Sequence, residues 1–254
     1  MTRVIKVGGR PQSDPTLLDA LATCWKREES KFVLVHGGGD EVSALQAALG
    51  RSASFVGGRR VTTAGDIDIV RMALSGTANK RLVAGLVDRG IDAIGLSGED
   101  AGAIVAKPLD VAQLGFVGAP CRVNTALLAH LVDGGYLPVI SPVSRAIGLS
   151  EGSTLNVNGD DAAAAIAASI GASELLFVAD VAGVMAGGMV IASLSIEGAK
   201  RLIEDGTASA GMRAKLEAGI TAIERGVARV RIADIRAIND TQRGTCLSAI
   251  GELS

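Results

Sequence analysis

The chain has 254 residues and a formal net charge of −2, and 48% of its residues are hydrophobic but only 2% are aromatic. This charge excludes the basic footprint of a nucleic-acid-binding protein, and the scarcity of aromatic side chains argues against base stacking. Its 3 cysteines and 2 histidines are widely spaced, which argues against a zinc site or a disulfide framework. No apolar run reaches membrane-spanning length and the N-terminus does not resemble a signal peptide, so we expect a soluble, cytoplasmic protein.

Strands of the buried type alternate with helical segments along the chain. Nearly continuous Val, Ile and Leu runs predict strands at 4–7, 32–35, 93–96, 137–140, 175–178 and 227–232. Helices are predicted at 16–29, 41–49, 66–89, 124–133, 160–170, 196–205 and 213–225. The alternation predicts an α/β fold, a three-layer αβα sandwich around a mainly parallel central sheet. A predicted helix ends near Gly171-Ala172 and a strand follows, so we expect two lobes at 1–172 and 173–254.

Two of the predicted strands end in adjacent glycines. The first leads into Lys6-Val7-Gly8-Gly9, and the second into His36-Gly37-Gly38-Gly39 at the start of a helix. Parallel strands bring their carboxyl ends to one edge of a sheet, so these turns predict neighbouring N–H groups with no Cβ in the way of an oxyanion. The chain has no Walker A loop and no G-x-G-x-x-G motif. We therefore expect a phosphoryl-transfer enzyme that is neither a P-loop nor a Rossmann protein.

Cationic side chains accompany these turns. Lys6 is the one charge in its apolar strand. A lysine at the end of a strand often extends its ammonium group into solvent and has no further role. An ammonium group beside glycine N–H groups can also bind a polyanion such as a phosphate chain. Arg59 and Arg60 follow another glycine pair. This pattern is equally consistent with a solvent-exposed turn and with arginines that bind a substrate carboxylate.

Two polar segments open helices further along. One is Asn156-Val157-Asn158-Gly159-Asp160-Asp161. A helix N-cap needs a single such residue, so the surplus predicts a polar cluster whose carboxylate orients lysines or faces a metal–nucleotide. The other places Lys215 in a first helical turn behind Gly211, where it is either an ordinary solvated residue or a group that reaches bound phosphates.

Taken in order, these segments resemble the amino-acid kinase family, and within it the enzymes that phosphorylate N-acetylglutamate. The resemblance covers essentially the whole chain. It rests on Lys6–Gly9, Val35–Gly39, Gly58–Thr62, Gly76–Lys80, Gly95–Gly98, Gly115–Gly118, Asn156–Asp160, Asp180–Val184 and Gly211–Lys215. The family's fold, shared with carbamate kinase, is the one that the alternation predicts. The implied reaction is ATP-dependent phosphorylation of the γ-carboxylate of N-acetyl-L-glutamate, in arginine biosynthesis.

The resemblance also implies a role for individual residues. Lys6 and Lys215 would stabilise the transferring phosphoryl group from two sides, and Asp160 would hold both lysines. The N–H groups of Gly9 and Gly38 would cradle the phosphoryl oxygens, while Gly38 and Gly39 line the acceptor site. Arg60 and Asn156 would bind the substrate's α-carboxylate and neighbouring polar groups.

ATP would bring its own Mg²⁺, and the protein would supply no metal site. The first lobe would bind the acyl amino acid and form a homodimer, and the second would bind ATP. The implied nucleotide-binding residues are Gly8, Gly9, Asp180, Val181, Ala182, Gly183, Val184, Met185, Gly211 and Met212.

The chain departs from the family pattern in a few places. Arg59 stands where the family more often has an aliphatic residue, which leaves open which arginine binds the carboxylate; the register favours Arg60. Gly159 replaces a usual alanine, Asp161 adds a carboxylate, and the stretch 183–191 is short for a hairpin over the nucleotide. The resemblance implies that arginine-inhibited members carry an extra N-terminal helix that links dimers into a hexameric ring. Because the first predicted strand begins close to Met1, we expect a homodimer that is insensitive to arginine.

Two alternatives stay open at this point. One is a kinase whose aminoadipate or glutamate acceptor is attached to an acidic carrier protein, against which the net charge of −2 argues mildly. The other is a catalytically silent relative that binds nucleotide and regulates a partner, which would not need to keep Lys6, Asp160 and Lys215.

Overall fold

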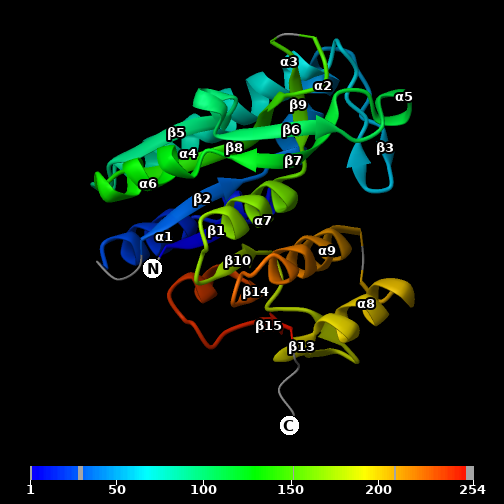
Figure 1. Cartoon of the computed structure of the whole chain (residues 1–254). Coiled ribbons are helices and arrows are strands. Elements are labelled where there is room, and N and C mark those ends of the chain that lie inside the picture. The colour runs from blue at the N-terminus through cyan, green and yellow to red at the C-terminus, as the bar shows by residue number, and fades with distance from the viewer. Residues whose placement is uncertain (1, 28–30, 151, 209, 250–254) are drawn as a thin grey trace.

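In the computed structural model, a sheet of 11 strands runs through the part of the chain that the structure describes, namely residues 2–27, 31–150, 152–208 and 210–249 (Figure 1). The strands follow the order β13-β15-β14-β10-β1-β2-β8-β6-β7-β9, and β5 pairs with β8. Their bounds are β1 (Arg3–Val7), β2 (Phe32–His36), β5 (Ala93–Gly98), β6 (Ile104–Pro108), β7 (Val117–Val123), β8 (Leu137–Ala146), β9 (Thr154–Val157), β10 (Leu175–Val178), β13 (Ser193–Ser195), β14 (Val230–Ala233) and β15 (Thr245–Ser248). Two short hairpins stand apart from the sheet, β3 (Phe55–Val56) with β4 (Arg59–Arg60) and β11 (Met185–Ala186) with β12 (Met189–Val190).

Helices cover both faces of the sheet. The α-helices are α1 (Leu17–Trp25), α2 (Gly39–Ala48), α3 (Ile67–Arg71), α4 (Asn79–Val87), α5 (Val111–Leu114), α6 (Thr125–Asp133), α7 (Gly159–Ser169), α8 (Ile196–Glu204) and α9 (Ala210–Glu224). Short 3-10 turns are η1 (Arg10–Ser13), η4 (Asp100–Gly102) and η5 (Ile235–Ile238), and η3 (Met72–Ala78) is π-helical. None of the helices that the structure describes is both long and apolar enough to cross a membrane.

The centre of the sheet is parallel. Strand β1 runs parallel to β2 and β10, and the pairs β2–β8, β5–β8 and β10–β14 are parallel as well. Antiparallel pairs occur further out, at β6–β7, β8–β9 and β14–β15. Parallel strands need both faces covered, which explains their continuous Val, Ile and Leu runs.

The alternation of side chains along β1 sorts the core into two layers. Val4 packs into the cluster that contains α7 and α9, whereas Ile5 and Val7 pack into the opposite cluster with α1 and α4. Successive strand residues face opposite sides, so Lys6 shares the face of Val4 and is directed toward α7. By the same rule His36, at the end of β2, shares the face of Leu34 and is directed toward α4.

The expected lobe boundary at 172/173 falls between α7 and β10. The sheet continues across this point, because β10 pairs with β1 along its whole length. In Figure 1 the second part of the chain nevertheless gathers on one side, with β10, β14, β15 and β13 carrying α8 and α9. The two parts thus share one sheet and differ in the helices and loops that they add to it.

The observed elements differ from the predicted ones at several points. The sequence does not predict strands β6, β7, β9, β13 and β15 of the main sheet. Pro108 and Pro120 weaken the strand signal of β6 and β7. The predicted helix 66–89 divides into α3, the π-helical η3 and α4. The predicted helix 16–29 ends at Trp25 and its last residues lie outside the described part of the chain, and the predicted strand 227–232 begins only at Val230.

Candidate active site

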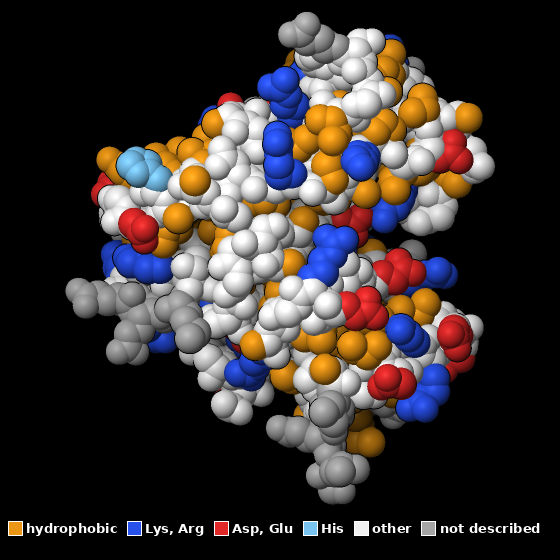
Figure 2. Space-filling model, in the orientation of Figure 1, with side chains coloured by type: hydrophobic (Ala, Val, Ile, Leu, Met, Phe, Trp, Pro, Cys, Tyr) orange, Lys and Arg blue, Asp and Glu red, His pale blue; other side chains and the backbone are white. Residues whose placement is uncertain are grey.

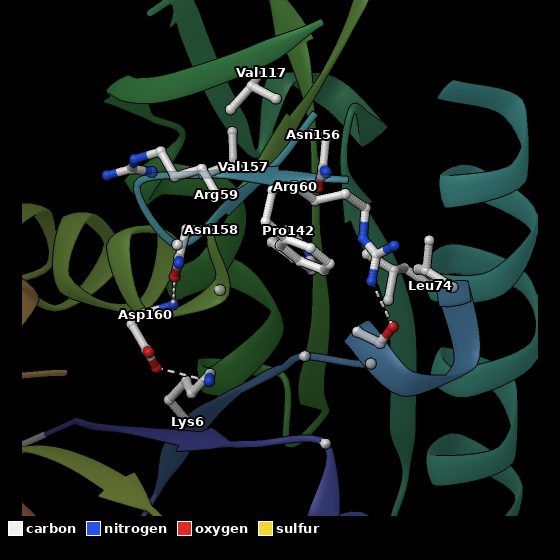
Figure 3. A pocket seen from close by; sticks show the side chains of 18 residues that line it. Lys6, Arg59, Arg60, Leu74, Val117, Pro142, Asn156, Val157, Asn158 and Asp160 are labelled. Carbon is white, nitrogen blue, oxygen red and sulfur yellow. Dashed lines mark hydrogen bonds and ion pairs between the residues drawn. The ribbon is translucent and has the colours of Figure 1, made fainter. Parts of the chain in front are cut away.

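Two lysines from opposite parts of the chain meet at one aspartate. Lys6 on β1 places its Nζ 2.6 Å from Oδ1 of Asp160, and Lys215 on α9 places its Nζ 3.4 Å from Oδ2 of the same carboxylate. Asp160 lies in the first turn of α7, whose N-cap Asn158 accepts a hydrogen bond from the Asp160 N–H at 2.7 Å (Figure 3). The cap fixes where α7 begins, and so fixes the carboxylate between the two ammonium groups.

This cluster is buried, and burial decides its electrostatics. The side chains of Lys6 and Asp160 are only 7% and 6% exposed. Burial lowers the pKa of Lys6, an effect that Asp160 offsets in part and that Lys215 reinforces. Burial alone would raise the pKa of Asp160, but the two ammonium groups outweigh it and keep the pKa of that carboxyl below its usual value. A carboxylate with two cations leaves a net positive site that suits an incoming anion.

The two glycine turns lie side by side next to this cluster, because β1 and β2 are parallel neighbours. Within the described residues, the N–H groups of Gly9 and Gly38 have no hydrogen-bond partner, whereas Gly8 and Gly37 donate to Val178 and Val7. Gly38 has a φ of 155°, and a Cβ there would lie 2.7 Å from Cδ2 of Leu74. A residue with a side chain would be strained at this φ, so the position favours glycine. The unpaired N–H of Gly38 is free to bind a ligand.

A cavity of about 230 Å³ lies beside the lysine–aspartate cluster. Its lining includes the predicted residues Lys6, Gly9, Gly38, Gly39, Arg60, Asn156 and Asp160. Figure 3 shows Arg60 and Asn156 approaching the cavity on the side opposite Lys6. The amide of Asn156 donates to Oγ1 of Thr62 at 3.0 Å, which ties β9 to the segment after β4.

Arg60 is held in place by helix α2. Its guanidinium donates to Oε1 of Gln46 at 2.6 Å, to the carbonyl of Gly39 at 2.7 Å and to Oγ of Ser43 at 2.8 Å. It also lies over the ring of Phe55, with 4.8 Å between Cζ and the ring centroid. A guanidinium fixed by so many contacts presents its remaining N–H groups in one orientation, as binding of a carboxylate by two parallel hydrogen bonds requires.

Arg59, the adjacent arginine, points away from Arg60 and over the start of α7 (Figure 3). Its guanidinium donates to Oδ2 of Asp161 at 2.7 Å. Burial raises the pKa of Asp161, and Arg59 counteracts that rise. Two of the three residues that depart from the family pattern therefore pair with each other. Both arginines line the cavity, but the guanidinium of Arg59 is engaged by Asp161, whereas that of Arg60 is held by α2.

A second cavity, of about 360 Å³, adjoins the first, and Gly9 lines both. Its lining includes the predicted nucleotide-binding residues Gly8, Gly9, Asp180, Val181, Gly211 and Met212, together with Arg10 and Lys215. Arg10 donates to Oδ2 of Asp180 at 2.8 Å, and this hydrogen bond lowers the pKa of that carboxyl. Lys6 thus borders one cavity and Lys215 the other, with Gly9 between them.

The remaining predicted nucleotide-binding residues, Ala182, Gly183, Val184 and Met185, do not line this cavity. The side chain of Val184 is buried in the core, and its N–H donates to Oγ1 of Thr245 at 2.8 Å. Met185 begins the β11–β12 hairpin and is 42% exposed. The hairpin over the nucleotide region, expected to be short, has 2 residues in each strand.

A third cavity separates the β3–β4 hairpin from helices α8 and α9. It is lined by Gly58, Arg59 and Asp161 on one side and by Ile203, Arg213 and Glu217 on the other. Figure 2 shows it as a notch between the two halves of the molecule, with charged side chains of both signs around it.

Several residues of the site were missed by the sequence analysis. Ser43 and Gln46 hold Arg60, and their spacing of three on α2 places them on one helical face, a signal that could have been used. The sequence analysis also missed Arg10 and Gln12, which lie in the turn η1, and Asn79, which lies at the junction of η3 and α4. At such places periodicity gives no information about the direction of a side chain.

Comparison with known proteins agrees with the geometry. The model of the amino acid kinase family matches residues 1–234. An acetylglutamate kinase of Chloroflexus aurantiacus is 41% identical over 253 residues, covering 99% of this chain and 98% of that protein. The crystal structure of smu.665 from Streptococcus mutans has a TM-score of 0.87 at 25% identity and covers 98% of this chain and 99% of that one.

The fold class is confirmed by a more distant structure as well. The carbamate kinase of Giardia has a TM-score of 0.71 at 16% identity, with 98% of this chain and 99% of that one covered. The predicted αβα arrangement with a mainly parallel sheet is therefore correct. On the match over residues 1–234 and the full-length relative, this chain belongs to the amino acid kinase family.

Proposed function

We propose that this chain transfers the γ-phosphoryl group of ATP to the γ-carboxylate of N-acetyl-L-glutamate and releases ADP and an acyl phosphate. Identity of 41% along the whole chain to an acetylglutamate kinase supports this acceptor. The observation that carries the chemistry is the convergence of Lys6 and Lys215 on Asp160, beside the unpaired N–H groups of Gly9 and Gly38. The product belongs to arginine biosynthesis.

The reaction needs placement and charge rather than proton transfer. A side-chain carboxylate is already ionised at neutral pH and can attack phosphorus directly, so no general base is required. We assign the acceptor to the cavity with Arg60 and Asn156, where Arg60 would bind the α-carboxylate. Lys6 would then reach the phosphoryl group from the acceptor side and Lys215 from the nucleotide side, and charge that develops on the transferring oxygens would be shared by both.

We assign ATP to the second cavity, lined by Gly8, Asp180 and Gly211, and Mg²⁺ enters with it as part of the substrate. Both oxygens of Asp160 already face lysines, and Asp180 faces Arg10. The magnesium ion would accordingly be bound by phosphate oxygens and water. Residues 1–172 would hold the acyl amino acid, and residues 173–254 would supply most of the nucleotide contacts.

We also propose a cytoplasmic homodimer. Strand β5 pairs only with β8 among the described strands and is therefore a sheet edge, and Val87 and Tyr136 near its beginning are 52% and 44% exposed. An edge flanked by apolar side chains suits contact with a second copy. Light scattering should give twice the chain mass, and a monomer would overturn this proposal.

The test of the function is a hydroxylamine trap. Hydroxylamine attacks the acyl phosphate, releases phosphate and leaves a hydroxamate, which forms a coloured complex with ferric iron. N-acetylglutamate, glutamate, aspartate and carrier-bound aminoadipate are compared in parallel with MgATP. The proposal expects hydroxamate with N-acetylglutamate at the highest kcat/KM. Product only from the carrier-bound acceptor, or nucleotide binding without product, would replace it with one of the two alternatives.

A further inference from the structure

One side chain connects the two glycine turns. The Nε2 atom of Gln12, in the turn η1, lies 2.9 Å from the carbonyl oxygen of Gly37 and 3.1 Å from the carbonyl oxygen of Gly8. A primary amide has two N–H groups, and both are used here. Because both partners are carbonyl oxygens, the end of the side chain that faces them is the nitrogen.

These two carbonyls belong to the peptide units that carry the unpaired N–H groups. In a trans peptide the C=O of one residue and the N–H of the next point in opposite directions from the same plane. The structure has no cis peptide bond among the described residues. With the Gly8 and Gly37 carbonyls directed at Gln12, the N–H groups of Gly9 and Gly38 are directed away from it. Gly9 lines both cavities and Gly38 lines the first.

His36 and Asn79 fix the second of these peptide units further. Nδ1 of His36 lies 2.8 Å from the Gly37 carbonyl, so this nitrogen carries the proton and donates it. The other ring nitrogen, Nε2, then accepts from the amide of Asn79 at 3.1 Å. The ring is buried, and burial lowers the pKa of His36 to about 4, so the neutral ring is retained at neutral pH.

The oxygen of the Gln12 amide does not stabilise the fold. This atom, Oε1, is buried and has no hydrogen-bond partner among the described residues. A buried acceptor without a partner is destabilising, and an apolar side chain of similar length would avoid that cost. The glutamine is therefore explained by its two donated hydrogen bonds, and those act on the glycine turns.

We infer that Gln12 is a positioning residue for phosphoryl transfer, which holds the Gly8–Gly9 and Gly37–Gly38 peptide units so that both N–H groups face the transferring phosphoryl oxygens. This rests on the proposed function of the site. Donors that are already oriented stabilise developing charge without reorganising, and a peptide free to rotate would present its carbonyl to the phosphoryl group instead. Gln12 itself lines neither of the two cavities assigned to the substrates.

The experiment compares Gln12→Met, which has a similar length and no donor, with Gln12→Glu, which has the same shape but only accepts at neutral pH. Ser13→Ala, on the exposed end of the same turn, is the control. We expect kcat to fall on the order of 10- to 100-fold in Gln12→Met while both KM values stay within about threefold, because the lost interaction acts in the transition state. Ser13→Ala should match the wild type.

Gln12→Glu supplies a second measurement, the pH dependence of kcat, which a purely structural role of Gln12 would leave unchanged. At neutral pH its carboxylate faces two carbonyl oxygens, which should make it slower than Gln12→Met. Protonation converts one oxygen into a donor, so the ratio of its kcat to that of the wild type should rise as the pH is lowered toward 5. A ratio that does not change with pH, or a Gln12→Met enzyme with wild-type kcat, overturns the proposal.

A binding measurement separates this inference from the function on which it rests. Titration calorimetry gives the affinity for MgADP alone and for MgADP with fluoroaluminate, which mimics the transferring phosphoryl group. Gln12→Met should weaken the second and spare the first. If the wild type makes no product from N-acetylglutamate, the proposed function fails, yet this pair of affinities still decides the role of Gln12; equal weakening of both would refute it.

Discussion

Lys6 and Asp160 form an ion pair of 2.6 Å that is almost fully withdrawn from water. The pair connects strand β1, which leads into the first glycine turn, to helix α7, whose first turn lines the acceptor cavity. An ion pair with the same distance lies at the surface. There Arg89 Nε is 2.6 Å from Asp19 Oδ1, and the side chains of Arg89 and Asp19 are 30% and 70% exposed. The two pairs differ in burial, in the type of cation and in the second lysine that Asp160 contacts, and these differences lead to the first prediction.

Asp160→Asn should lower the free energy of unfolding by about 3 kcal/mol, because it leaves two buried ammonium groups without their counter-ion. Asp19→Asn, the matched control, should change it by less than about 1 kcal/mol. Urea denaturation at neutral pH measures both. Equal effects of the two substitutions would mean that the Lys6–Asp160 pair is no more important to the fold than a surface pair.

Arg60→Lys should raise the KM for N-acetylglutamate about 10- to 100-fold while the KM for ATP stays unchanged. A lysine cannot contact Gln46, Ser43 and a substrate carboxylate together, and a hydrogen bond to a charged group contributes about 1.5–3 kcal/mol. Arg59→Leu, which removes the partner of Asp161, should raise the same KM less. Steady-state kinetics decides, and a larger effect of Arg59→Leu would identify Arg59 as the carboxylate-binding arginine.

Gly38→Ala should impair both folding and catalysis. The φ of 155° is one that residues with a side chain rarely adopt, so the turn that presents the Gly38 N–H would be strained, and the new Cβ would also lie 2.7 Å from Leu74 Cδ2. We expect a loss of more than about 1 kcal/mol in unfolding free energy and of about 10-fold or more in kcat. Gly76→Ala is the control, because a Cβ at Gly76 meets nothing within 4 Å. Similar behaviour of the two variants would contradict the steric argument.

The buried His36 predicts how stability depends on pH. Its pKa in the folded protein is about 4, below its ordinary value of 6.5, so the unfolded chain binds the proton more tightly between these values. The neutral ring therefore contributes its full stability above pH 6.5, and this contribution falls as the pH drops toward 4, by roughly 3 kcal/mol in all. Urea denaturation at several pH values should show a steeper fall for the wild type than for His36→Gln, and parallel curves would contradict it.

Much of the site could be predicted because it depends on strand ends. The runs that lead into Gly8-Gly9 and Gly37-Gly38-Gly39 are nearly continuous in apolar residues, which identifies central parallel strands, and such strands must end at one edge. The structure places Lys6, Asp160 and Arg60 around one cavity there. The roles of these residues in catalysis remain the predictions made above.

The contacts that orient the site could not be predicted from spacing. Gln12 reaches a carbonyl 25 positions away and Arg59 pairs with a carboxylate 102 positions away, and neither separation follows from a helical or strand period. Val184 belongs to a motif that suggested nucleotide contact, but its apolar side chain is buried in the core. Positions of this kind depend on how distant turns meet, which is a property of the folded chain.

The account depends most on the two lysines acting on one phosphoryl group, and a double-mutant cycle tests this most directly. Hydroxamate formation from N-acetylglutamate is measured for the wild type, Lys6→Ala, Lys215→Ala and the double variant, with Lys200→Ala, an exposed lysine of α8, as the control. Each single active-site substitution should lower kcat by about 10²- to 10³-fold, and the double variant should lose clearly less than the product of the two. Wild-type rates in either single variant, or fully multiplicative losses, would contradict a shared role at one transferring group.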